Sequence, residues 1–136
     1  MNRSDERAGS MRSFPAEAES LADIREYVRG LAQIARLPER TTEDLVLAVS
    51  EACANAVVHS GSSSMQIAWR PGPDRVEIEV RDQGLFRNRV RLPTVDGPGG
   101  FGIPLMAALT EEVVIEEGTR RRPGTTVRLT KRTERP

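Results

Sequence analysis

The stretch EDLVLAVSEACANAVVHSG, residues 43–61, decides how the rest of the chain is interpreted. Almost every residue in it is small or apolar, a pattern typical of a helix that is buried on nearly all sides. Acidic residues at its start and Ser60-Gly61 at its end are typical helix boundaries. We therefore predict a buried helix that begins near Thr41 or Thr42 and stops at Ser60-Gly61.

The polar residues inside this helix need an explanation. Glu51, Asn55 and His59 are spaced four apart, and steps of four advance about 40° around a helix, so they form one slanted stripe. A carboxylate in an apolar setting is costly unless it meets a charge, a hydrogen-bond network or water. A cavity containing Mg²⁺, water and phosphate would satisfy it. A stripe that simply faces solvent on an amphipathic helix would leave the same pattern.

The neighbouring segments predict helices on one side of a mostly antiparallel sheet, which is a two-layer α+β sandwich. Apolar residues at helical spacing indicate a first helix from Ser20, with Ser20 and Asp23 as its N-cap pair. Alternating residues predict a hairpin after the long helix. The expected elements are strands at 11–14, 65–70, 76–81, 112–116 and 125–131, and helices at 20–35 and 101–109.

A second group of candidate residues is Asp82-Gln83-Gly84, where the second hairpin strand ends. Counting by twos from Val76 places Asp82 on the apolar face of that strand. An inward carboxylate needs a donor, and the exocyclic amine of adenine is a suitable one, while Gly84 lets backbone approach a base closely. An ordinary Asp turn that ends a strand is the alternative.

Two further segments contain glycines at positions that suit a nucleotide. The run GPGGFG, residues 97–102, leads directly into a helix, where glycines and free N–H groups could surround phosphate oxygens. A flexible lid or a helix-start turn is the alternative. In Gly124-Thr125-Thr126-Val127, Thr125 shares a strand face with Val127, so its hydroxyl is expected to face inward, as it would in an ordinary strand as well.

Composition excludes several classes of protein. The 136 residues include 20 basic and 20 acidic side chains, so nothing in the charge balance favours nucleic-acid or membrane binding. The single cysteine, Cys53, excludes a disulfide within the chain and is expected to be a small buried apolar residue. No apolar run approaches membrane-spanning length, and no signal peptide begins the chain, so a cytoplasmic protein is expected.

Together and in this order, these segments resemble one known arrangement. Residues 43–61 resemble the N-box of the gyrase, chaperone, histidine kinase and MutL (GHKL) ATPase superfamily. RDQGLF (81–86) and GPGGFGIPLMAAL (97–109) resemble its two glycine boxes, and GTTVRL (124–129) its closing strand. SEACANAVVH (50–59) and PLMAALTEEVVIE (104–116) are more specifically similar to the anti-sigma factor serine/threonine kinases. The resemblance covers residues 14 to 131 and implies a Bergerat-type ATP-binding fold.

The resemblance implies a role for each matching residue. Asn55 would coordinate Mg²⁺, and Glu51 would be the catalytic base toward a serine hydroxyl. The remaining implied contacts are to ATP. Asp82, Gly84 and Thr125 would hold adenine, Gly99, Gly100, Phe101 and Gly102 would surround the phosphates, His59 would line the phosphate side, and residues 85–98 would form a lid.

The function implied is that of an ATP-binding anti-sigma factor with serine-protein kinase activity. Its partners would be an anti-anti-sigma (STAS-type) protein, which it phosphorylates, a sigma factor, which it sequesters, and a second copy of itself. Direct binding to nucleic acid or membrane is not expected. We expect one ATP-binding domain at residues 11–131, between a flexible tail at 1–10 and another at 132–136.

Two departures from the family pattern leave an alternative function open. Phe86 stands where the first glycine box has a second glycine, and Pro98 stands where the related kinases often carry a basic residue. Phosphoryl transfer depends on neutralising charge on the transferred group. The alternative is a nucleotide-binding regulatory module that binds its partner with little or no kinase activity.

Overall fold

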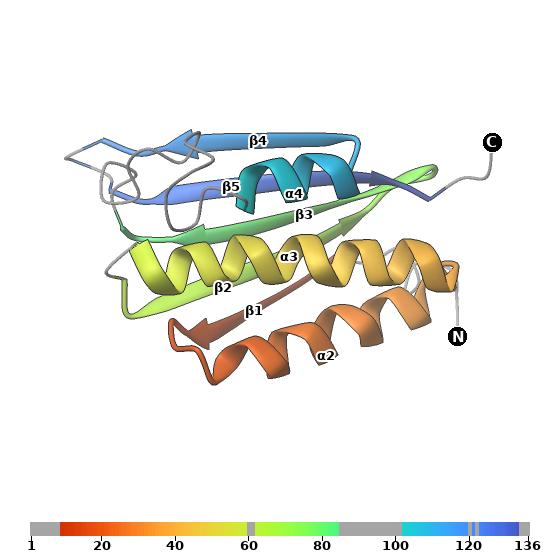
Figure 1. Ribbon diagram of the computed structural model, residues 1–136, viewed down its shortest axis with the longest axis horizontal. Helices are drawn as coiled ribbons and strands as arrows, with labels where there is room; N and C mark the ends of the chain where they lie inside the picture. Colours follow the sequence, from red (N-terminus) through yellow and green to blue (C-terminus); the bar gives the residue numbers. More distant parts are fainter. Residues whose placement is uncertain (1–8, 60–61, 85–101, 120, 122, 134–136) are drawn as a thin grey trace.

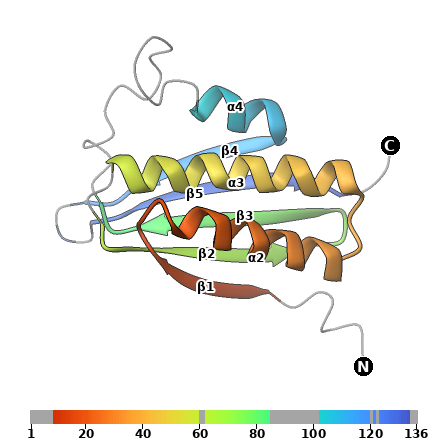
Figure 2. The same ribbon diagram turned by 60° about the horizontal axis from the view of Figure 1, so that its bottom comes forward.

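The computed structural model describes residues 9–59, 62–84, 102–119, 121 and 123–133. Within them, five strands form one sheet and three helices cover one of its faces (Figures 1 and 2). The elements in chain order are β1 (Ser10–Pro15), α2 (Ser20–Ile34), α3 (Glu39–His59), β2 (Ser64–Pro71), β3 (Arg75–Asp82), α4 (Gly102–Leu109), β4 (Glu112–Glu117) and β5 (Thr125–Arg132). The predicted two-layer α+β sandwich is therefore confirmed.

The sheet has the strand order β1-β2-β3-β5-β4, and all neighbouring pairs are antiparallel. After β3 the chain passes through α4 to the edge strand β4, and β5 then returns to pair between β3 and β4. The consequence is that the end of β3 lies beside the start of β5, where Asp82 is opposite Thr125. Two of the predicted site segments are thus brought together by strand order alone.

The core lies between the sheet and α3, the most buried helix (Figure 2). Residues of α3 that face the sheet are almost inaccessible to solvent, and they meet the inward side chains of β2, β3 and β5. Examples are Leu45, Val49 and Ala56 of α3 against Ile78 and Leu129 of the sheet, all at most 1% exposed. The prediction of a buried central helix is confirmed, and so is the burial of the single cysteine.

The helix starts differ from the predictions, for reasons that lie in the backbone. Glu19, not Ser20, is the N-cap of α2, and it makes no side-chain cap bond. Ser20 is buried, and its N–H donates to the carbonyl of Glu17. α3 begins at Glu39, because the carbonyl of Pro38 already accepts hydrogen bonds from both the N–H and the hydroxyl of Thr42.

The face of the sheet opposite the helices carries charged side chains. Arg128 on β5 forms ion pairs with Glu79 at 3.0 Å and with Glu116 at 2.8 Å, and Arg70 pairs with Glu79 at 3.1 Å. The hydrogen bond that Arg128 donates to Glu79 contributes most to the raised pKa of Arg128. Opposite charges on neighbouring strands make this a solvated face whose polar groups satisfy one another.

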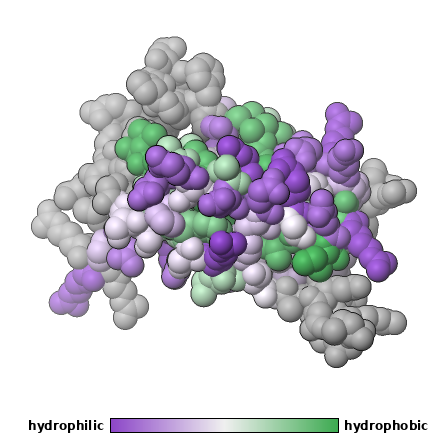
Figure 3. All heavy atoms as spheres, turned by 90° about the horizontal axis from the view of Figure 1, so that it is seen from below, coloured by the Kyte–Doolittle hydropathy of each residue, from purple (hydrophilic) through white to green (hydrophobic). Residues whose placement is uncertain are grey.

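Large apolar side chains are exposed only singly among the described residues. They are Met11 on β1, Ile34 on α2, and Leu47 and Val58 on α3. Figure 3, seen from the side of α2 and β1, shows hydrophobic groups separated by hydrophilic ones. In the described part of the chain, no helix combines the length and the apolar character that crossing a membrane requires.

Candidate nucleotide-binding site

Asp82 ends β3 with its side chain on the same side of the strand as the core. It is 3% exposed, and Val76, Ile78 and Val80, at two-residue steps before it, are equally buried. This confirms the inward orientation that strand periodicity predicts. One carboxylate oxygen, Oδ1, accepts a hydrogen bond of 2.7 Å from the N–H of Gly84. The bond bends the chain back over the carboxylate and holds the carboxylate in one orientation.

Thr125 joins Asp82 and Gly84 from the neighbouring strand. Its side chain is 1% exposed, as its inward-facing position predicts, and its hydroxyl donates to the carbonyl oxygen of Gly84 at 3.1 Å. Just before it, Gly124 has a φ of +147°, which side-chain-bearing residues rarely adopt. A Cβ at Gly124 would lie 3.0 Å from the carbonyl oxygen of Asp82. Only glycine lets the two strands approach this closely.

Sequence reasoning missed a further residue at this end of the sheet. Ser62, in the connection between α3 and β2, accepts a hydrogen bond of 3.2 Å from the N–H of Gln83 and donates one of 2.8 Å to the carbonyl of Ser64. It thereby ties the end of β3 to the start of β2. A serine in a polar connection carries no signal that would have identified it, because its partner is distant in sequence.

Asn55 and Glu51 lie one helical turn apart on α3. Asn55 is 8% exposed, and its side chain makes no hydrogen bond with the part of the chain that the structure describes. Glu51 is half-buried, and within the same residues it has neither an ion pair nor a hydrogen bond. Leu47 and Val58 are the exposed residues on the adjacent side. Glu51 and Asn55 thus lie along the border between the surface and the interior, and the side-chain amide of Asn55 lies on the interior side of that border.

The thiol of Cys53 on α3 lies near the carboxylate of Asp82 at the end of β3. Burial raises the pKa of its thiol, and the negative charge of Asp82 raises that pKa further. Such a charge effect requires that the carboxylate lie near the inner side of α3, in surroundings of low dielectric constant. Cys53 lies between Glu51 and Asn55 along α3, so the carboxylate of Asp82 lies near the level of these two residues along the helix axis.

Several predicted site residues cannot be placed. Gly99, Gly100 and Phe101 lie outside the described residues, as do Phe86 and Pro98. His59 is the last residue of α3, but its side chain is also outside the description. Gly102 is the first residue of α4. The glycine run therefore ends where a helix begins, as predicted.

A cavity of about 460 Å³ opens beside the turn between β4 and β5. Glu51 and Asn55 do not line it, and Arg81, Glu116 and Thr126 place much of it on the open face of the sheet. The cavity therefore lies at the end of β3 and does not adjoin Glu51 or Asn55. Its lining residues are Arg81, Asp82, Gln83, Glu116, Glu117, Gly118, Pro123, Gly124 and Thr126.

The placed residues fit a magnesium nucleotide. Asn55 offers a buried amide oxygen without a partner in the described chain, and amide oxygens are ligands that Mg²⁺ accepts. Asp82 offers a carboxylate oriented by backbone, in surroundings that favour recognition of an N–H donor. The first turn of α4 has no acidic residue that would repel a phosphate.

Residues 14–131 match the family described as Histidine kinase-like ATPase domain. The chain belongs to this family. The match spans every described element except the first part of β1 and the last residue of β5. The ATPase fold expected from the sequence is thereby confirmed, and use of ATP is the property that defines the family.

Relatives within the ATPase family are protein kinases by name. The Serine-protein kinase RsbW of Bacillus velezensis is 32% identical over 87% of this chain and 81% of its own length. RsbW of Bacillus licheniformis is 35% identical over 86% of this chain and 81% of its own length. The chain thus resembles these kinases over most of both lengths, and the resemblance to anti-sigma factor kinases is confirmed.

A solved structure has the same fold. The crystal structure of the RsbU and RsbW domains of Rv1364c from Mycobacterium tuberculosis superposes with a TM-score of 0.74 at 24% identity. The superposition covers 95% of this chain and 33% of that one. This chain therefore corresponds to about a third of the longer protein.

Proposed function

We propose that this protein is a serine-protein kinase and anti-sigma factor that binds Mg-ATP between α3 and the β3–β5 junction. Its protein substrate is a STAS-type anti-anti-sigma protein, and its regulatory target is a sigma factor. The single observation that carries the proposal is the buried amide of Asn55, which has no hydrogen-bond partner among the described residues, one helical turn from the half-buried Glu51. The serine-protein kinases to which the chain is similar support the same assignment.

Each placed residue has a defined task in this function. Bound Mg-ATP supplies the phosphoryl group that is transferred. Asn55 holds the metal through its amide oxygen, and Asp82 accepts a hydrogen bond from the adenine amine. Glu51, which has no ion-pair partner in the described chain, takes the proton from the attacking serine hydroxyl. Thr125 and Gly84 keep the Asp82 carboxylate in place.

The cellular setting follows from the same proposal. The protein acts in the cytoplasm as a homodimer, without direct contact to nucleic acid or membrane. Its ATP-binding domain comprises residues 11–131 together with Ser10 and Arg132, the outer residues of β1 and β5.

The second candidate function is a regulatory module that binds nucleotide and partner but transfers phosphate slowly or never. Pro98 favours it, since the related kinases often carry a basic residue at that position. The two candidates differ in one measurable property, which is the appearance of phosphoserine on the partner.

The test is incubation with γ-labelled ATP and candidate STAS proteins, combined with binding measurements. Label on a partner serine supports the kinase, and Mg-ATP binding without label for any candidate supports the module. Asn55→Ala should abolish magnesium-dependent binding. Glu51→Gln should keep ATP affinity and stop transfer, whereas Glu39→Gln, an exposed residue of the same helix, should change neither. Unchanged transfer in Glu51→Gln would remove Glu51 as the base.

A further inference from the structure

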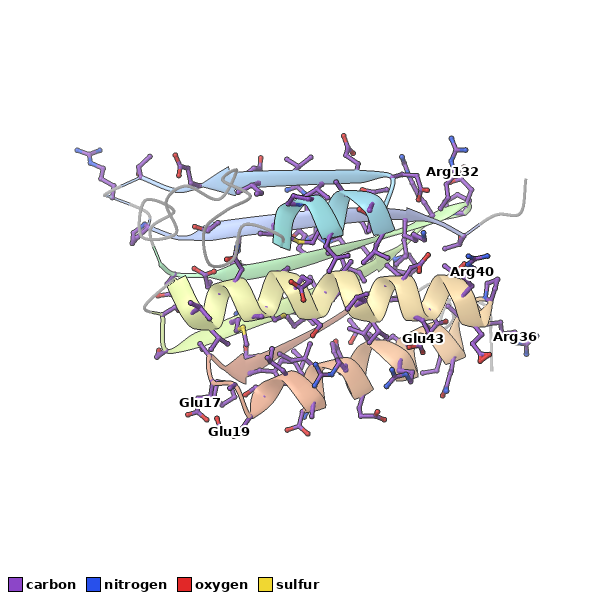
Figure 4. All side chains as sticks on the ribbon, viewed as in Figure 1. Glu17, Glu19, Arg36, Arg40, Glu43 and Arg132 are labelled. Carbon is purple, nitrogen blue, oxygen red and sulfur yellow. The ribbon has the colours of Figure 1, made fainter. Side chains whose placement is uncertain are left out.

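Lys131 connects three elements at the end of the molecule opposite the candidate nucleotide site. Its ammonium donates a hydrogen bond of 2.8 Å to the carbonyl oxygen of Leu109, the last residue of α4. It also pairs with the Asp44 carboxylate of α3 at 3.1 Å. Figure 4 labels Arg132, the residue that follows Lys131, at this end of the molecule. Lys131 is the only lysine in the sequence.

The position of Lys131 makes these contacts stronger than those of a surface ion pair. Its side chain is 15% exposed, so solvent and salt screen the ammonium less than they screen a charge on the surface. The Leu109 carbonyl is among the last four of α4, which have no partner within the helix. A cation at this end also interacts favourably with the helix dipole. Lys131 therefore caps α4 and attaches it to α3 at once.

α4 depends on such attachments because it is short. It has eight residues, and helices of this length are not stable alone in water. Met106 is fully buried, whereas Pro104, Ala107 and Ala108 are exposed, so only one side of α4 is held by packing. At its C-terminal end the helix is capped locally, because the Thr110 hydroxyl donates to the Met106 carbonyl at 2.7 Å.

A second backbone connection follows directly after α4. The N–H of Glu111 donates to the carbonyl of Thr130 at 2.9 Å, and the carboxylate of Glu111 accepts from the N–H of Arg132 at 2.6 Å. These bonds and Lys131 fix the C-terminal end of α4 against β5. Because a helix behaves as a stiff rod, fixing that end, together with the packing of Met106, limits where the N-terminal end at Gly102 can lie.

We propose that Lys131 is a positioning residue for the phosphate end of the nucleotide site. It holds α4 so that the N–H groups of the first turn, which begins at Gly102, are directed at the phosphates of ATP. Lys131 itself touches no substrate. The inference rests on the proposed function, since it requires that a nucleotide phosphate lie at the start of α4.

The test compares the affinities for Mg-ATP and for adenosine, which lacks phosphates, by calorimetric titration. In Lys131→Met, the affinity for Mg-ATP should fall about tenfold, which corresponds to about 1.4 kcal/mol of binding free energy. The affinity for adenosine should stay within about twofold, or about 0.4 kcal/mol. Lys131→Arg should restore Mg-ATP binding. Asp44→Asn should have a smaller effect, because the bond to the Leu109 carbonyl remains.

The matched control is Arg132→Met. Arg132 follows Lys131 in sequence and carries the same charge, but its side chain is exposed. This variant should leave both affinities unchanged. If Lys131→Met does not fold, Lys131→Gln keeps an N–H donor for the Leu109 carbonyl without the charge and should show a partial, phosphate-specific loss. Equal losses for Mg-ATP and adenosine, or unchanged Mg-ATP binding, would overturn the inference. Failure of the proposed function differs, because the unmodified protein would then not bind Mg-ATP.

Discussion

The hydroxyl of Thr125 donates a hydrogen bond of 3.1 Å to the carbonyl of Gly84, and the N–H of Gly84 donates one of 2.7 Å to the carboxylate of Asp82. A single glycine thus links a strand-end carboxylate to the neighbouring strand. Asp82 and Thr125 are also directly opposed in the β3–β5 register. The carboxylate proposed to accept from adenine is therefore held by a side chain 41 residues downstream of Gly84.

Replacing Thr125 with valine tests this link. The variant keeps the shape of the side chain and loses the donor to Gly84, so the free energy of unfolding should fall by about 1 kcal/mol. Affinity for ATP should fall about fivefold, because Gly84 and Asp82 are no longer held together. Denaturant unfolding and ATP titration measure the two effects. Thr126→Val, on the opposite face of the same strand, should retain ATP affinity, and an equal loss there would contradict the prediction.

Gly124 and Gly30 form a matched pair for glycine-to-alanine substitution. In Gly124→Ala, the added Cβ would meet the Asp82 carbonyl at 3.0 Å in a backbone conformation that alanine rarely adopts, so unfolding free energy should fall by about 1–3 kcal/mol. In Gly30→Ala, no atom lies within 4 Å of the added Cβ. Because alanine is favoured over glycine inside a helix, the free energy of unfolding should rise by about 0.5–1 kcal/mol. Denaturant unfolding measures both, and effects of the same sign would refute the interpretation.

Arg36 ends α2 in a conformation that favours glycine. Its φ is 60°, and the N–H groups of Arg36 and Leu37 donate to the carbonyls of Gln33 and Ala32, as in a Schellman motif. Arg36→Gly should raise the free energy of unfolding by about 0.5–1 kcal/mol, because the left-handed conformation disfavours a Cβ. Thermal unfolding measures the change. Arg40→Gly, at an exposed position inside α3, should instead lower stability, and a loss at Arg36 would contradict the assignment.

The Cys53 thiol should make stability depend on alkaline pH. Its pKa in the folded chain is raised above the ordinary value of 9.0, first by burial and then by Asp82. The folded state therefore binds the proton more tightly than the unfolded state. This contribution to stability is complete below pH 9 and is lost as pH rises toward the folded pKa, by at most about 1.4 kcal/mol per pH unit.

The measurement is denaturant unfolding of the protein and of Cys53→Ala between pH 7 and pH 10. The protein should lose stability faster than the variant above about pH 9, because only the protein has to keep a buried thiol protonated. Parallel curves would show that the thiol does not titrate differently in the two states. In the folded protein, the same buried thiol should also resist alkylation at pH 8.

The candidate site could be predicted from sequence wherever a local period determines where a side chain points. The two-residue period of β3 correctly directs Asp82 inward, and that of β5 does the same for Thr125. The four-residue spacing on α3 puts Glu51 and Asn55 on one stripe. Ser62 and Lys131 could not be identified in this way, because each acts through partners from other elements. The roles of all these residues in binding and catalysis stay predictions.

The sequence by itself determined the helices and strands of this protein, because the spacing of apolar residues, the turn residues and the positions of glycines are properties of short segments. Only the tertiary structure decided which segments meet. Strand order places β5 beside β3, and this order depends on pairing between segments more than 40 residues apart, which no local pattern encodes. The same holds for helix starts such as Glu39, where the Thr42 N–H donates the first helical hydrogen bond to the carbonyl of Pro38. Because nearly every residue carries the same backbone N–H and C=O groups, the residue types do not reveal which of these groups pair. The pairing depends on how the whole chain folds.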